Sequence, residues 1–344
     1  MARFTRTRIL AALALLVLSV MASACLPEQQ RQETAAEAAV RGRQTPEGRI
    51  VTADQASNTL TLVDVATNEA YGTIKTGQQP HHVVASPDGK ELWVSLYGEN
   101  RLQVFDAASL NEIASVDVGA SNDDLIFEPS GKMLYVSLGS TDSVAVVDVA
   151  ARKMVKTVKV GKTPHGVRTS PDGSMLAVTN TADNNISVLS LQPEAEIKAT
   201  IKTGPNPFEV YISEDNKTAY VSNFLGDSIS VVDLVEGKQS GFIRSGKQPA
   251  MLILQGGAGS QKLWVASTGS GEVWAIDPAT RKLITRVQVG KGAHGVAATP
   301  SGKLFVTNST DNTLSVVDSN TNQVLATLPV GNNPNGITYV PNAQ

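Results

Sequence analysis

TPHGVRTSPDGSMLAVTNTADNNISVLSLQPEAEIKATIKTG, residues 163–204, contains four short runs rich in Val, Ile, Leu and Thr. The runs are separated by clusters of Pro, Asp, Asn and Gly, and none follows the 3.6-residue period of a helix. Pro171, Asp172 and Gly173 are turn residues, because proline fixes φ, aspartate bonds to the backbone and glycine adopts the left-handed conformation. The segment therefore predicts four β-strands, at 166–170, 175–180, 186–191 and 197–203.

The same unit recurs seven times along the chain. A glycine that closes an apolar run marks each copy, and successive glycines lie 41 to 44 residues apart: Gly77, Gly119, Gly161, Gly204, Gly246, Gly290 and Gly331. Four strands per unit at this period indicate a β-propeller, since a parallel β-helix uses shorter rungs and a sandwich would not repeat so evenly. We therefore predict an all-β fold, a seven-bladed β-propeller with four-stranded blades.

The two ends of the repeat region complement each other. Residues 335–341 read as a first strand with no blade after it, and residues 49–53 read as a second strand with no first strand before it. The C-terminal strand is therefore predicted to complete the N-terminal blade, which leaves no open edge where the ring closes. The propeller is expected to span residues 49–341, followed by a short tail at 342–344.

The N-terminal segment is typical of export. Residues 1–24 combine three arginines, an apolar run too short to span a membrane comfortably and the small residues 22–24, which predicts a signal peptide rather than an uncleaved anchor helix. Cys25, the only cysteine, follows directly in a context that resembles an imperfect bacterial lipobox. We expect a lipid on Cys25 and a polar tether over 25–48, although ordinary signal peptidase cleavage would leave the same first residue.

Net charge narrows the class of partner. The full chain has 29 basic and 32 acidic residues, and loss of residues 1–24 removes three arginines and no acid, leaving a formal charge of −6. This balance argues against a nucleic-acid partner. We expect an exported lipoprotein, periplasmic or at the cell surface, held to the membrane by its lipid.

The strand sequences also carry a family resemblance. MLAVTN (175–180), TAYVSN (218–223) and KLFVTN (303–308) each follow a tight turn and resemble the repeats of YVTN-repeat β-propellers, the YncE-like bacterial exported proteins. The resemblance covers all seven units and implies a seven-bladed propeller. It implies no specific activity, because the residues it rests on are structural. LQGGAGSQKL (254–263) and SNDD (121–124) depart from the repeat pattern.

All four histidines of the chain lie just after the repeat glycines. In a propeller these entry segments ring the mouth of the central channel. The fourth residue after each glycine is His81, Asp123, His165, Phe208, Ala250, His294 and Asn335, and the fifth is His82, Asp124, Gly166, Glu209, Met251, Gly295 and Gly336. The predicted ligand-binding residues at the channel mouth are His81, His82, Asp123, Asp124, His165, Phe208, Glu209, His294 and Asn335.

A metal is one candidate occupant of this ring. Imidazole is a common ligand of zinc and copper, so His81, His165 and His294 are the predicted metal ligands, with carboxylates completing the shell. The loops between second and third strands add rim carboxylates and predict an acidic face: Asp54, Glu99, Asp142, Asp183, Asp227 and Asp311. The opposing interpretation is that duplication of one ancestral repeat spread the histidines, and that a seven-bladed channel is too wide for them to share one ion.

The motifs leave several functions open. No CxxCH, GxSxG, HExxH or P-loop pattern occurs, so no catalytic residue is assigned. The favoured hypothesis is a non-enzymatic, lipid-anchored propeller that binds a protein or small ligand at the channel mouth. The alternative is a metal carrier or metal-dependent propeller enzyme, either a lactonase-like hydrolase or a copper redox protein, that uses the histidine ring. A third is a subunit of a redox or cell-surface assembly.

Overall fold

The computed structural model describes residues 40, 43, 45–192, 194–257 and 260–342. The chain divides into two units, Met1–Gln44 and Thr45–Gln344, and every described strand belongs to the second. The predicted signal peptide, Cys25 and most of the predicted tether lie outside the described residues. Within the described part, no helix is long and apolar enough to cross a membrane.

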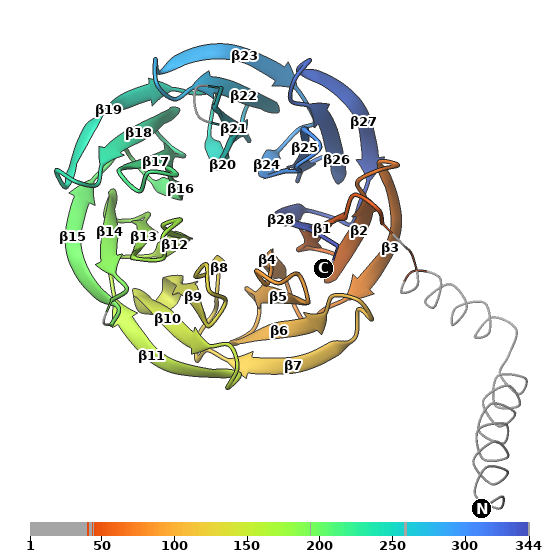
Figure 1. Cartoon of the computed structure of the whole chain (residues 1–344), viewed down its shortest axis with the longest axis horizontal. Helices are drawn as coiled ribbons and strands as arrows, with labels where there is room; N and C mark the ends of the chain where they lie inside the picture. The colour runs from red at the N-terminus through yellow and green to blue at the C-terminus, as the bar shows by residue number, and fades with distance from the viewer. Residues whose placement is uncertain (1–39, 41–42, 44, 193, 258–259, 343–344) are drawn as a thin grey trace, which may run out of the picture. The chain divides into compact units, whose positions relative to one another are not determined.

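Seven four-stranded antiparallel sheets form a ring, which confirms the predicted seven-bladed propeller (Figure 1). Blade 1 contains β28 (Pro334–Val340), β1 (Arg49–Asp54), β2 (Thr59–Asp64) and β3 (Glu69–Lys75). Blade 2 contains β4 (Pro80–Ala85), β5 (Glu91–Leu96), β6 (Arg101–Asp106) and β7 (Glu112–Asp117). Blade 3 contains β8 (Leu125–Phe127), β9 (Met133–Leu138), β10 (Ser143–Asp148) and β11 (Lys153–Lys159), with the 3-10 turn η1 (Gly139–Thr141) between β9 and β10.

The other four blades use their strands in chain order from the channel outward (Figure 1). Blade 4 contains β12 (Pro164–Thr169), β13 (Met175–Asn180), β14 (Asn185–Ser190) and β15 (Glu196–Lys202). Blade 5 contains β16 (Pro207–Ile212), β17 (Thr218–Asn223), β18 (Ser228–Asp233) and β19 (Lys238–Arg244). Blade 6 contains β20 (Pro249–Gln255), β21 (Lys262–Ser267), β22 (Glu272–Asp277) and β23 (Lys282–Gln288), and blade 7 contains β24 (Ala293–Ala298), β25 (Lys303–Asn308), β26 (Thr313–Asp318) and β27 (Gln323–Pro329).

The ring closes as the sequence predicts. β28 pairs antiparallel with β1, with Arg49 opposite Val340 and Val51 opposite Thr338, so the last strand of the chain is the first strand of blade 1. Residues before β1 add to this contact, because the Asn342 side-chain amide donates to the Pro46 carbonyl at 2.8 Å. The two chain ends are thus joined without an open strand edge.

Burial follows the position of each strand in its blade. The second and third strands are almost wholly buried, as in β5 and β6, whereas the outermost strand β7 is largely exposed. Trp93 and Trp264 are fully buried between blades, and the Trp93 ring packs edge-on to Phe127 of the next blade at 5.9 Å between centroids. Burying side chains of this size stabilises the ring by about 2–3 kcal/mol each.

Three of the repeat glycines pack against an asparagine at the end of the second strand. The Gly161 N–H donates to Asn180 Oδ1 at 3.1 Å, and a Cβ on Gly161 would lie 2.6 Å from the Asn180 side chain. The same fit recurs for Gly204 with Asn223 and for Gly290 with Asn308. At these three positions no larger residue fits beside the asparagine side chain, which accepts the glycine N–H in the first and third cases.

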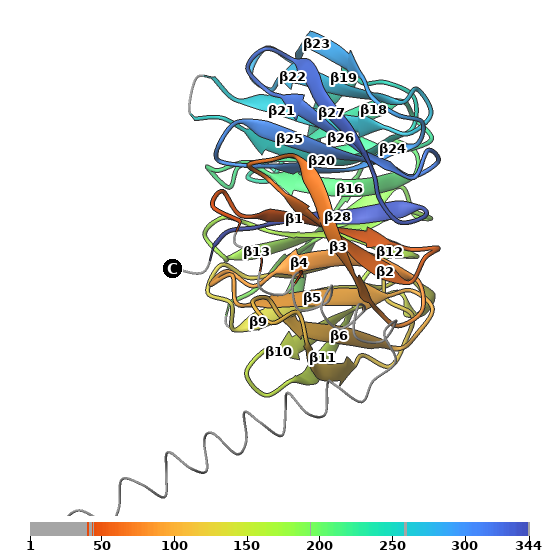
Figure 2. The same cartoon turned by 90° about the vertical axis from the view of Figure 1, so that its right-hand side faces the viewer.

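The entry segments and the second-to-third-strand loops lie on one face of the ring, here called the channel-mouth face. The Gln79 N–H, in the segment that leads into β4, donates to Asn58 Oδ1 in the loop after β1 at 2.8 Å. The equivalent bond joins the Thr163 N–H to Asp142 Oδ1 at 3.0 Å. Figure 2 shows the ring edge-on, with the strands running between its two faces.

Candidate functional site

The channel-mouth residues lie on a β-bulge of the innermost strand. In β12, Pro164 pairs with Asn180 and Val167 pairs with Val178, so His165 and Gly166 lie together opposite the single residue between them. The same shift occurs in β4, β16, β20 and β24, and between β28 and β1. A bulge re-aims the side chains that it carries. In these six blades the irregularity therefore sets the orientation of the fourth and fifth residues after the repeat glycine, whereas in blade 3 Asp123 and Asp124 precede the regular strand β8.

Buried hydroxyl groups on the second strands hold these bulges. Thr179 Oγ1 accepts the Gly166 N–H at 2.8 Å and lies 2.9 Å from the Phe208 carbonyl of the next blade, to which it donates. Ser95 Oγ plays the same part in blade 2, accepting the His82 N–H at 2.9 Å and donating to the Asp123 carbonyl at 2.5 Å. Each hydroxyl thus fixes a bulge and the carbonyl of the neighbouring blade together.

The same two carbonyls fix the orientation of two histidine rings. His81 Nδ1 lies 3.3 Å from the Asp123 carbonyl, and His165 Nδ1 lies 3.1 Å from the Phe208 carbonyl. A carbonyl oxygen only accepts, so in the neutral form of either ring Nδ1 carries the proton. The lone pair is then on Nε2 of each ring, which is the form in which imidazole binds a metal.

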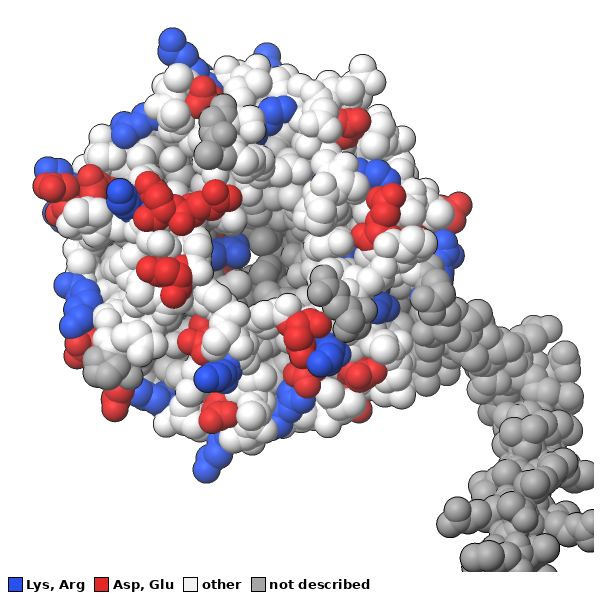
Figure 3. All heavy atoms as spheres, in the orientation of Figure 1, with Lys and Arg blue, Asp and Glu red and all other residues white. Residues whose placement is uncertain are grey.

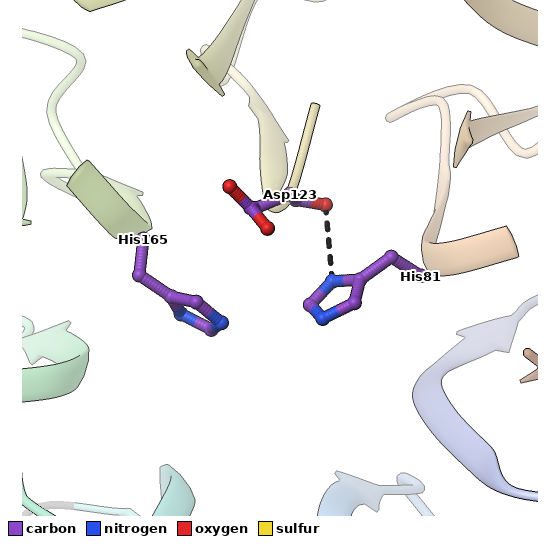
Figure 4. Close-up of side chains that lie close together, drawn as sticks. All are labelled: His81, Asp123 and His165. Atoms are coloured by element: carbon purple, nitrogen blue, oxygen red, sulfur yellow. Dashed lines mark hydrogen bonds between the residues drawn. The ribbon is translucent and has the colours of Figure 1, made fainter. Parts of the chain in front are cut away.

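His81, Asp123 and His165 converge in the channel, although they come from three consecutive blades (Figure 4). One ligand atom from each residue can be chosen so that all three atoms lie within 4.8 Å of one another. The two imidazole rings meet edge to face with centroids 5.5 Å apart. Burial, reinforced by the His165, His294 and His82 rings, holds the pKa of His81 well below its ordinary value, so this ring is neutral at pH 7.

Asp123 contributes a buried carboxylate to this cluster. Burial raises the pKa of its carboxyl group, and the charge of His165 and the Gly139 N–H oppose that rise. A Cβ on Gly139 would lie 2.8 Å from Asp123 Oδ2, so this residue of η1 must be a glycine for the carboxylate to lie where it does. SNDD (121–124), which departs from the repeat pattern, thus places an acid between two histidines.

His294 lies away from this cluster. Its ring contacts Phe208 edge to face at 5.4 Å between centroids, and Phe208 in turn stacks on His165 at 3.9 Å. Burial, with the nearby His165 charge, lowers the pKa of His294 to about 4. Of the predicted metal ligands, His81 and His165 are therefore adjacent, Asp123 completes their group, and His294 lies beyond the Phe208 ring.

A buried second layer of polar side chains lies next to the cluster of His81, Asp123 and His165. It is formed by the fifth residues after the repeat glycines. His82 Nδ1 lies 2.7 Å from Asp124 Oδ1, and Asp124 also accepts the Val167 N–H at 3.0 Å. Burial alone would raise the pKa of Asp124, but His82 and the Val167 N–H outweigh it and lower the pKa to about 2. Burial and the Asp124 charge raise the pKa of Glu209 well above its ordinary value, because two buried carboxyl groups this close do not readily both ionise.

Most of the rim carboxylates accept hydrogen bonds from backbone N–H groups. Glu99, Asp142, Asp183, Asp227 and Asp311 each accept a backbone N–H from an entry segment. Asp54 is fully buried in blade 1. Most carboxylates of the predicted acidic rim therefore stabilise the loops on this face through hydrogen bonds. The face of the ring in Figure 3 shows basic and acidic side chains interspersed around the central opening.

One residue near the site, Tyr97, was not identified from the sequence. Tyr97 lies in the loop after β5, and its ring is 5.9 Å from that of His81. Tyr97 could have been identified from the sequence, because it is an aromatic residue in a loop that was assigned to the channel-mouth face. The remaining predicted residue, Asn335, is buried and its side-chain amide donates to Gln55 Oε1 at 3.4 Å.

The chain is similar to one known family. The family model described as "YNCE-like beta-propeller" matches residues 74–174, and together with the seven blades this match confirms the resemblance drawn from the repeats. No curated protein matches the chain significantly.

Solved structures share the fold at low sequence identity. A functionally unknown protein from Desulfotomaculum acetoxidans has a TM-score of 0.75 at 15% identity, covering 86% of this chain and 99% of its own. The periplasmic gluconolactonase PpgL of Pseudomonas aeruginosa has a TM-score of 0.70 at 21% identity, covering 85% and 99%. A putative 6-phosphogluconolactonase from Bacteroides fragilis has a TM-score of 0.71 at 15% identity, covering 87% and 99%. At these identities the similarity concerns the fold alone.

Proposed function

We propose that this chain is an exported binding protein whose channel mouth holds a transition-metal ion on His81, Asp123 and His165. The observation that carries the proposal is the convergence of ligand atoms from these three residues within 4.8 Å. Their positions are set by the fold rather than by flexible loops, because bulges and inter-blade hydrogen bonds orient both rings. A site that is preorganised in this way loses little entropy when it binds an ion.

The donor set favours zinc or copper. Two imidazole nitrogens and one carboxylate oxygen form a mixed set that both metals accept, whereas calcium and magnesium prefer oxygen alone. Each ring also has the supporting hydrogen bond that metal-bound histidine usually makes through its other nitrogen. The metal would neutralise the buried carboxylate of Asp123.

The location of the protein forms part of this proposal. Residues 1–24 as a signal peptide and Cys25 as a lipid attachment point would place the ring outside the cytoplasm, on a tether long enough to let it meet a partner protein. Metabolic labelling with a fatty-acid analogue checks this part separately. Loss of the label in Cys25→Ser supports the anchor, and an unlabelled wild-type chain contradicts it.

Elemental analysis tests the metal site. Protein purified without an affinity tag is loaded with Zn²⁺ or Cu²⁺, desalted and measured for bound metal. We expect about one equivalent in the wild type and less than about 0.2 in His165→Ala and Asp123→Ala. His294→Ala is the matched control, because its ring lies beyond Phe208, and it should keep its metal. A wild type without metal, or equal loss in His294→Ala, would contradict the proposed ligand set.

Metal-assisted hydrolysis is the second candidate for the same site. A bound metal polarises a carbonyl or activates a water molecule, and Asp123 lies beside the place where that would occur. Among the structural neighbours, PpgL is named as a gluconolactonase, which makes δ-gluconolactone a reasonable first substrate. Turnover by the loaded wild type that disappears in His165→Ala would favour the enzyme, and absence of turnover in the loaded protein would favour simple binding.

A further inference from the structure

A second candidate site opens on the channel-mouth face between blades 1 and 2. It is a cavity of about 640 Å³, and its lining consists of five amide side chains, one aromatic ring and one alanine: Gln55, Asn58, Gln78, Gln79, Asn333, Tyr97 and Ala56. No charged residue lines it. It belongs to neither the metal cluster nor the buried second layer, and the repeat pattern does not explain it.

Hydrogen bonds among the lining residues hold the walls of this cavity. Gln79 adopts a left-handed backbone with φ of 53°, and its N–H donates to Asn58 Oδ1 while its carbonyl accepts the Tyr97 N–H at 2.9 Å. On the opposite wall, the Asn333 side-chain amide donates to Gln55 Oε1 at 3.1 Å. The cavity is therefore formed before any ligand enters.

The same bonds leave several polar groups available. Among the described residues, the side-chain amides of Gln78 and Gln79 and the hydroxyl of Tyr97 make no hydrogen bond. Tyr97 is 47% exposed although its backbone is anchored. An amide offers both donors and an acceptor, and a tyrosine ring offers a flat apolar surface with a polar tip.

The equivalent gaps between other blades have different chemistry. The residue after the repeat glycine is Gln78 in this gap but Lys162, Lys247 or Lys291 in three others. A cavity without charge does not select an ion, since a charged ligand would lose hydration without gaining an opposite charge. It suits a neutral ligand in which each hydroxyl both donates and accepts and whose ring carbons present an apolar face.

We propose that this amide cavity binds a neutral saccharide. The amides of Gln78, Gln79 and Asn58 pair with its hydroxyl groups, and the Tyr97 ring packs on its apolar face. Because the Tyr97 ring also contacts His81, the saccharide lies next to the proposed metal cluster. The cavity does not need the metal to form, since none of its supporting hydrogen bonds involves His81, Asp123 or His165.

The test is binding of defined oligosaccharides to the full exported chain by calorimetry and saturation-transfer NMR. The neutral probes are maltohexaose, cellohexaose and chitohexaose, and oligogalacturonate and a Gly-Ser hexapeptide represent charged and peptide ligands. We expect at least one neutral probe to bind, with about tenfold weaker binding in Gln78→Ala and in Tyr97→Ala. Lys247→Ala, at the equivalent position of another gap, is the matched control and should bind normally.

Three results would overturn the proposal: no neutral probe binds, only the charged or peptide probe binds, or neither cavity variant weakens binding. Metal content measured on the same samples separates the two sites. Gln78→Ala should keep its metal, and His165→Ala should keep most of its saccharide affinity while losing the metal. If the metal proposal fails, the saccharide result can therefore still be interpreted. If the saccharide proposal fails, the metal result can likewise still be interpreted.

Discussion

Each blade carries two positions, four residues apart, that behave in opposite ways. The repeat glycine is the same in all seven blades, and in six of them it packs on a buried side chain at the end of the second strand; Gly119 is the exception, with nothing within 4 Å of its Cβ position. The channel-mouth residue four places later is a histidine in three blades and Asp, Phe, Ala or Asn in the others. Glycine recurs because six blades leave no room for a Cβ at this position, whereas in blade 3 Gly119 adopts a left-handed backbone with φ of 76°. The side chain that points into the channel is free to differ, and the candidate site lies where the blades differ.

The largest effect is expected at the repeated position. In Gly290→Ala the new Cβ would lie 2.6 Å from the Asn308 side chain, so the free energy of unfolding should fall by about 2–3 kcal/mol. Urea unfolding followed by fluorescence measures this change. Gly257→Ala is the matched control, because open space surrounds that glycine and stability should hardly change. Equal stability of the two variants would remove the packing explanation for the repeat.

An intermediate effect is expected at Thr179, which connects the end of the second strand to the channel-mouth bulge of the same blade. Thr179→Val removes the hydroxyl that anchors the Gly166 bulge and the Phe208 carbonyl, which in turn orients His165. Metal affinity should fall about tenfold and stability by about 1 kcal/mol.

Ser222→Ala is the control for that variant. Ser222 anchors the Glu209 bulge at 3.0 Å, outside the metal cluster. It should lose similar stability but keep its metal affinity, as measured by competition with a chromogenic chelator. A fall in affinity of the same size in both variants would mean that the hydroxyls act only through general stability.

The smallest effect concerns Asp54, which occupies the asparagine position in blade 1. Burial raises its pKa, and the hydroxyls of Thr61, Thr52 and Thr59 only partly oppose that rise. The folded state therefore binds the Asp54 proton more tightly than the unfolded state, and stability falls as pH rises from the ordinary aspartate pKa to the raised one. Asp54→Asn should remove this fall, so its stability relative to wild type increases as the pH rises above the ordinary aspartate pKa of about 4. Parallel pH profiles of thermal unfolding for the two proteins would contradict this assignment.

Much of the architecture was predictable from local patterns. Turn residues such as Pro171-Asp172-Gly173 and the spacing of the repeat glycines indicate four strands and seven blades, because turn chemistry and strand periodicity depend on near neighbours. The pairing of residues 335–340 with residues 49–54 also followed, since an unpaired strand at each end of a closed ring has one partner left.

The candidate site was predictable only in part. Its location on the entry segments followed from the fold, and His81 and His165 were identified, with His294, as candidate metal ligands. Asp123 was expected as a channel-mouth residue but not as the third member of their group, and Phe208 was not expected to separate His294 from them. The width of the channel and the direction of each ring depend on bulges and on carbonyls from the next blade, which no single repeat encodes.

The sequence by itself determined the fold class, the number of blades, the closure of the ring and the set of residues at the channel mouth. These follow from local backbone preferences repeated seven times, so each copy reinforces the others. Only the tertiary structure decided which of those residues meet, which nitrogen of His81 and His165 is available, and that amide side chains line a cavity beside Tyr97. Such relations join side chains from different blades, and their geometry is set by packing across the ring rather than by any one segment of the chain.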